Sequence, residues 1–217
     1  MLFAQLDQLA LQLFAGGPVE LRRRLHLRRI HPMTMRPNPF WEYSVLLYGD
    51  QRVAAACLAI QERHRSHADI DVNVLLLCTW AAATGAGELD TDKLLRAMAA
   101  VGPWRRDVVL PLRATRNTLD QGVAPVPKEV SEAVRGDVLK AELEAESIEQ
   151  MMLIEIIGRP ASRAVAAERA IAQAATSFAR YFTLLRVDPT TEDDKDLARI
   201  LAVAFPGSRH GNQPGGG

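Results

Sequence analysis

The feature that most constrains the fold is an apolar run from Val72 to Ala83, in which only Asn73 and Thr79 are polar. A helix that is apolar on all sides has to be enclosed by other elements. The run is too short to cross a bilayer, which takes about 20 apolar residues. We therefore expect a buried central helix that begins after an N-cap at Asp71 and stops at Gly85. A buried strand is the alternative, but the Ala-Ala-Ala-Thr-Gly ending and the helical patterns on both sides favour a helix.

Helix-start and helix-stop signals flank this run. Asn38 is a favoured N-cap residue and Pro39 suits the first helical position, so a helix should begin there. Asp50 is placed to cap a second helix, and Asp90 to cap a further helix that should end at Gly102. Because β-branched runs are also few, these signals predict an all-α fold. We expect a compact multi-helix bundle around a buried central helix, followed by a C-terminal helical hairpin arm.

The helix expected over residues 103–119 is the most informative. Its predicted inward stripe has three- and four-residue spacing and contains Trp104, Val108, Leu112, Thr115 and Leu119. A second group falls within an arc of about 100° beside that stripe and contains Arg105, Arg106, Arg113 and Arg116. Arg105 and Arg116 should project toward the core, where a charged group needs an acidic or carbonyl partner. Glu42 and Asp71 are the expected partners.

Composition changes after Gly122, where the linker GVAPVP precedes a glutamate-rich helix from Lys128 to Ile157. The acidic face of that helix is either solvated or a docking strip for a basic partner. The next helix carries apolar residues at alternating four- and three-residue spacing, namely Ile171, Ala175, Phe178, Phe182 and Leu185. This spacing predicts a knobs-into-holes seam, within the chain or between chains. Thr190 or Thr191 should cap the last helix.

These segments suggest four parts along the chain. They are a basic amphipathic N-terminal extension over residues 1–35, a helical core domain over 36–122, a C-terminal helical arm over 123–205 and a disordered tail over 206–217. Arginines cluster around leucines in the extension, which would suit anionic lipid or nucleic acid. The alternatives are a solvated helix that packs on the body, or a start of translation at Met33 or Met35.

Charge and cysteine content limit the function classes. The 26 basic and 26 acidic residues balance, so no whole-molecule field points to nucleic acid or to a membrane surface. Cys57 and Cys78 lie among alanine and leucine, which suggests buried, reduced thiols and a cytoplasmic protein. The N-terminus lacks the basic n-region of a secretory signal, and we expect no integral membrane segment.

Three motifs occur in order within residues 37–122: PNPFWEYSVLLY, DVNVLLLCTWAA and PWRRDVVLPLRATRNTL. They resemble a family of small proteobacterial proteins that carry a domain of unknown function, and KAELEAESIEQMMLIE extends the likeness more weakly. The resemblance implies an all-helical bacterial cytoplasmic protein, and it brings no reaction, cofactor or catalytic residue. Residues 1–34 and those after about Gly158 depart from the family's usual extent.

The recognised sequence signatures of catalysis are missing. The chain has no Walker-type GxxxxGK, no GxGxxG after a strand, no GxSxG and no HExxH. Weak candidates for a metal site are His64, His67 and Asp69, with Glu62 and Asp71 nearby, because imidazole and carboxylate suit divalent transition metals. The histidines lie three residues apart near a helix end, where protonated histidine also favours the helix dipole. We therefore expect no metal and no cofactor.

The candidate ligand site combines the arginines with acidic, amide and aromatic side chains. Its members are Arg105, Arg113, Arg116, Trp41, Glu42, Tyr43, Asp71, Asn73 and Trp104. In the structural interpretation these residues clamp helices together. In the functional interpretation the arginines bind the carboxylate or phosphate of an anionic small molecule, because guanidinium matches such groups bidentately and an aromatic wall adds stacking area. No catalytic residue is assigned.

The leading hypothesis is a non-enzymatic cytoplasmic interaction or regulatory protein, with a protein partner or self-association through the C-terminal helices. It depends on the missing catalytic signatures, the charged arm and the heptad-like seam. Two alternatives stay open. One is a binder or enzyme for an anionic ligand held by the arginines. The other is a peripheral nucleic-acid or membrane-surface binder that uses the basic N-terminal segment, with nucleic acid the less favoured partner.

Overall fold

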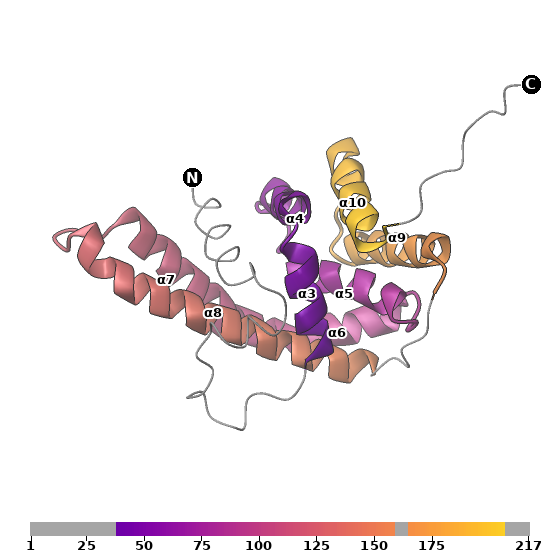
Figure 1. Cartoon of the computed structure of the whole chain (residues 1–217), viewed down its shortest axis with the longest axis horizontal. Coiled ribbons are helices and arrows are strands. Elements are labelled where there is room, and N and C mark those ends of the chain that lie inside the picture. Colours follow the sequence, from indigo (N-terminus) through magenta and orange to yellow (C-terminus); the bar gives the residue numbers. More distant parts are fainter. Residues whose placement is uncertain (1–37, 159–164, 207–217) are drawn as a thin grey trace, which may run out of the picture. The chain divides into compact units, whose positions relative to one another are not determined.

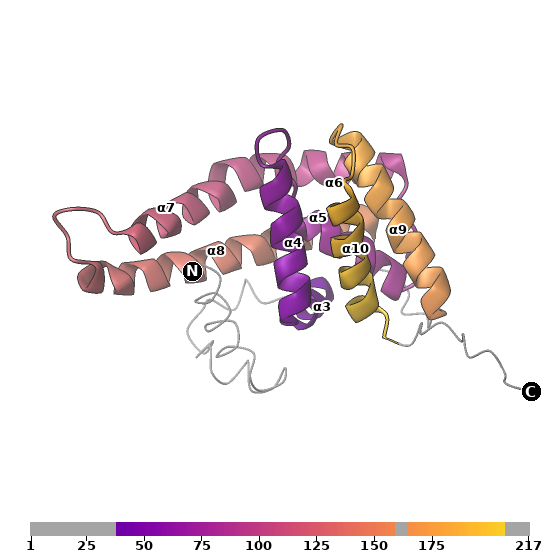
Figure 2. The same ribbon diagram turned by 90° about the horizontal axis from the view of Figure 1, so that it is seen from above.

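The computed structural model describes residues 38–158 and 165–206, and over these residues the chain is helical and contains no strand (Figures 1 and 2). The predicted all-α fold class is therefore confirmed. In chain order the elements are α3 (Pro39–Tyr48), α4 (Gln51–His64), α5 (Val72–Ala83), α6 (Thr91–Trp104), the π-helix η2 (Arg105–Val109), α7 (Leu110–Gln121), α8 (Lys128–Ile157), α9 (Ala167–Leu184) and α10 (Thr191–Ala204). The predicted extension over residues 1–35 and nearly all of the predicted tail over 206–217 lie outside the described residues.

The described residues form two compact units, and each unit combines early and late parts of the chain. The first unit contains residues 38–51 and 92–158, and the second contains residues 52–91 and 165–206. The first therefore holds α3, α6, η2, α7 and α8, and the second holds α4, α5, α9 and α10. The division into a core over 36–122 and an arm over 123–205 stays a prediction. None of the described helices is long and apolar enough to cross a membrane.

The central apolar helix of the second unit is α5, and it is buried as predicted. Every residue from Asn73 to Ala82 is buried. Asp71 caps the helix, because its side chain accepts a 2.9 Å hydrogen bond from the Asn73 backbone N–H. Gly85 follows the helix with a φ of 83°, a left-handed conformation that glycine adopts without steric cost. The alternative of a buried strand is wrong.

Helix α9 packs along α5 within the second unit. The predicted seam is only partly right: Phe178 and Phe182 are buried, but Ala175 is exposed. The inward face also includes Ser177 and Tyr181, two polar residues that the hydrophobic pattern did not select. Their hydroxyl oxygens accept hydrogen bonds from the backbone, Tyr181 from the Asp71 N–H at 2.8 Å and Ser177 from the Leu89 N–H at 2.9 Å. Buried hydroxyls with such partners can occupy core positions.

In the first unit, α6, η2 and α7 follow one another without a break, so the predicted helix end at Gly102 is wrong. A residue before proline normally avoids helical geometry because its Cβ meets the proline ring, and Gly102 has no Cβ. The backbone then widens in η2, where the Leu110 N–H donates to the carbonyl of Arg105, five residues earlier. Pro111 therefore follows a π-turn, which is a common place for a helix to bend.

The π-turn also changes which face of this long helix points inward. In η2 and α7 the buried residues are Arg105, Val109 and Arg116, whereas Thr115 of the predicted stripe is exposed. A π-turn inserts one residue, so every side chain after it rotates relative to an ideal 3.6-residue helix. The predicted inward position of Arg105 and Arg116 is confirmed, and the predicted position of Thr115 is wrong.

Helix α8 spans Lys128–Ile157 as predicted and packs against α7 as an antiparallel hairpin (Figures 1 and 2). Hydrogen bonds also join the second half of α8 to α3 and α6 of the first unit. The Asn38 side-chain amide at the start of α3 donates to the Ser147 carbonyl at 3.0 Å. The Trp104 indole N–H donates to the Ala145 carbonyl at 2.9 Å. The predicted N-cap is also confirmed, because Asn38 accepts a hydrogen bond from the Trp41 backbone N–H.

Candidate functional site

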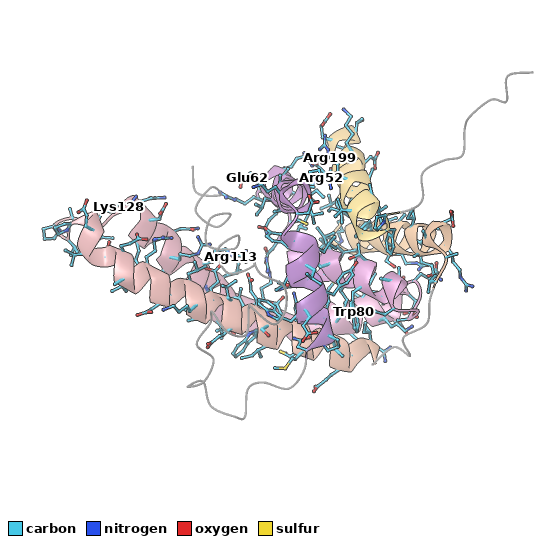
Figure 3. The ribbon with its side chains drawn as sticks, in the orientation of Figure 1. Arg52, Glu62, Trp80, Arg113, Lys128 and Arg199 are labelled. Atoms are coloured by element: carbon cyan, nitrogen blue, oxygen red, sulfur yellow. The ribbon has the colours of Figure 1, made fainter. Side chains whose placement is uncertain are left out.

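An ion-pair cluster joins α7 to α8, and we call its members Arg113, Arg116, Glu142 and Glu146 the Arg–Glu clamp. Arg113 is labelled in Figure 3. The Arg116 guanidinium donates to both carboxylate oxygens of Glu142, at 2.6 and 3.3 Å. Arg113 donates to Glu142 at 3.0 Å and to Glu146 at 2.6 Å. The arginines are three residues apart and the glutamates four, so each pair shares one face of its helix.

The clamp is deeply buried at one end. The side chains of Arg116 and Glu142 are 6% and 5% exposed, whereas those of Arg113 and Glu146 are 26% and 21% exposed. Burial acts to lower the pKa of Arg113, but Glu146 and Glu142 together outweigh it and the pKa is raised. Two positive and two negative charges therefore neutralise each other inside the hairpin. An anion from solution would have to compete with these carboxylates for the same guanidinium donors.

Arg105 lies on η2 and is buried close to the clamp. Arg105 belongs to the first unit, and its positive charge opposes the rise in the pKa of Arg113 that the two glutamates cause. The structure thus brings together the three arginines that the sequence singled out. It gives Arg116 a different partner from those predicted, because Glu142 of α8 takes the place of Glu42 and Asp71.

The remaining candidate residues have other positions. Trp104 donates its indole N–H to α8, so it has a structural contact in the first unit. On α3, Trp41 and Tyr43 are half-buried and Glu42 is exposed. Asp71 and Asn73 belong to the second unit, where Asp71 caps α5. The aromatic and acidic members are therefore spread over several elements.

The weak metal candidates also separate. His64 is buried in the second unit, with its Nε2 atom 2.9 Å from the Asp193 carboxylate of α10, while His67 and Asp69 are exposed. Arg63 donates to Asp193 and, at 2.8 Å, to Asp196. In the part of the chain that the structure describes, no three His, Cys, Asp or Glu side chains gather as a metal site would require.

We call Arg63, His64, Asp193 and Asp196 the α4–α10 cluster; sequence reasoning missed it as a group. The Asp193 side chain is fully buried, and its carboxylate also accepts from Thr190 in a capping box at the start of α10. Burial acts to raise the pKa of this carboxyl, but hydrogen bonds from Thr190, His64 and Arg63 lower it by more. The two threonines at the start of α10 indicated where that helix begins, and nothing local indicated the contact with α4.

The two cysteines lie in the second unit and are buried. Burial raises the pKa of the Cys57 thiol to about 12 and raises that of Cys78 as well. Thiols in such surroundings stay protonated at neutral pH and behave as small apolar groups. Neither is placed to act as a nucleophile.

The opposite end of the hairpin, away from the α3 contact, carries exposed apolar side chains. We call Val123, Val126, Val130 and Val134 the valine tip. Their exposed fractions are 46%, 46%, 65% and 54%, respectively. The first two lie in the α7–α8 linker and the others on the first two turns of α8, which begins at Lys128 (labelled in Figure 3). Clustered exposed valines are uncommon on a protein surface and mark candidate interaction sites.

Residues 39–153 match the model of a family described as protein of unknown function (DUF2390). The chain belongs to this family. The predicted resemblance is thereby confirmed, and the matched range runs from α3 through most of α8, so DUF2390 includes both the Arg–Glu clamp and the valine tip. Helices α9 and α10 lie beyond the match to DUF2390. The search of curated proteins and the search of solved structures gave no match.

Proposed function

We propose that this chain is a non-enzymatic helical interaction module whose α7–α8 hairpin binds protein through the valine tip. The exposure of Val130 and Val134, at 65% and 54%, is the observation that carries the proposal. An amphipathic helix normally buries its apolar residues, and these two lie on α8 without cover from α7. A cytoplasmic location agrees with two buried, protonated thiols and is part of the proposal.

The Arg–Glu clamp supports this function by fixing the hairpin. Hydrogen bonds from Arg113 and Arg116 to α8 hold the helices in one register, and Arg116 engages both oxygens of Glu142. A rigid hairpin loses little conformational entropy when a partner binds its tip. The clamp thus prepares the binding surface without taking part in it.

The alternative of an anionic ligand has less support. Arg113 and Arg116 direct their donors at Glu142 and Glu146, so the positive charge of these two arginines is already neutralised within the protein. The third hypothesis, a basic N-terminal segment that binds membrane or nucleic acid, concerns residues outside the described range.

The proposal can be tested by site-specific photo-crosslinking in cells that express the full chain. A photoreactive amino acid at position 134 should give a discrete protein adduct, because this site lies in the binding surface. The matched control is Ala172, which is exposed on α9 outside the valine tip and should give none.

A second variant shows whether the adduct depends on the apolar surface. Val130→Glu in the chain that carries the photoreactive residue should abolish the adduct, because a carboxylate would have to be desolvated at the contact. Equal adduct yields from positions 134 and 172, or an adduct that persists with Val130→Glu, would contradict the proposal.

A further inference from the structure

We draw no further inference here: the strongest candidate, the exposed apolar face of Val130 and Val134 at the start of α8, belongs to the valine tip already described, and nothing in the described part of the chain shows what covers it.

Discussion

At the scale of single residues, Arg116 and Glu142 form the most deeply buried pair of the Arg–Glu clamp. Arg116→Ala would leave the Glu142 carboxylate buried with one arginine fewer, which should lower the free energy of unfolding by about 3–5 kcal/mol. Arg113→Ala should cost less, because Arg113 and Glu146 are partly solvated. Urea unfolding followed by circular dichroism measures both changes.

A double-mutant cycle separates the interaction between Arg116 and Glu142 from a general loss of packing. The double variant Arg116→Ala/Glu142→Ala should lose less stability than the sum of the two single variants, because the buried charges leave together. Strict additivity would show that the two side chains do not interact, and the clamp would then be the wrong explanation for the α7–α8 contact.

Asp193 in the α4–α10 cluster should make the stability of the second unit depend on pH. Its pKa in the folded state lies below the ordinary value of 3.8. A carboxyl with a lowered pKa contributes stability above its ordinary pKa, and that contribution is lost as the pH falls through the folded value. Asp193→Asn should therefore destabilise the protein by about 2 kcal/mol at pH 7. The difference from wild type should shrink below about pH 4.

Thermal unfolding of the two proteins between neutral and acid pH measures this effect. Asp194→Asn is the matched control, because Asp194 is exposed on the same helix turn. A difference between wild type and Asp193→Asn that stays constant down to acid pH would show that the carboxylate charge contributes nothing.

At the scale of elements, α8 contains a glycine that its geometry does not need. Gly136 is helical, and a Cβ added there would meet no atom within 4 Å. Gly136→Ala should therefore raise the free energy of unfolding by about 0.5–1 kcal/mol, because alanine has the better helix propensity. Gly158→Ala is the contrast, since Gly158 follows the helix with a φ of 79°.

Chemical denaturation of the two glycine variants provides the measurement. Gly158→Ala should lower stability, because a side chain is strained at positive φ. A destabilising Gly136→Ala would show that something packs against this position.

Element starts could be predicted from local chemistry, and long-range partners could not. Asn38 and Asp71 cap helices where the sequence placed them, and Thr190 is the cap of the two threonines proposed, because a cap depends on residues two or three positions away. The helix end predicted at Gly102 was wrong, because a π-turn is set by packing as well as by Gly and Pro. Glu142 and Glu144 look alike in sequence, and only the position of α7 buries the first and leaves the second exposed.

The candidate site could likewise be predicted only in part. Helical spacing placed Arg105 and Arg116 toward the core, which the structure confirms. Their nearest acidic residues in the predicted core were Glu42 and Asp71, because α8 was assigned to a separate arm. The valine tip could not be recognised, since Val130 and Val134 have the pattern of core residues and only the tertiary structure shows them exposed.

At the scale of the whole molecule, the DUF2390 match and the two units cover different residues. Helix α5 lies inside the match, whereas α9, which covers α5 in the second unit, lies outside it. A chain that ends at Gly158 would lose α9 and α10 and expose the apolar surface of α5. We expect it to aggregate or to bind a hydrophobic dye strongly. A chain that ends at Pro206 should do neither.

Dye fluorescence and sedimentation distinguish these two truncated chains. A monomeric chain that ends at Gly158, with native helicity and no dye binding, would show that α9 does not contribute to the core around α5. The described family range would then fold alone.

The most direct test of the interaction module is the mass of the adduct that forms from position 134 in cells. The account predicts a crosslinked species heavier than the 23.9 kDa chain, formed from position 134 and not from position 172. If neither position gives an adduct, the result would contradict the binding role of the valine tip.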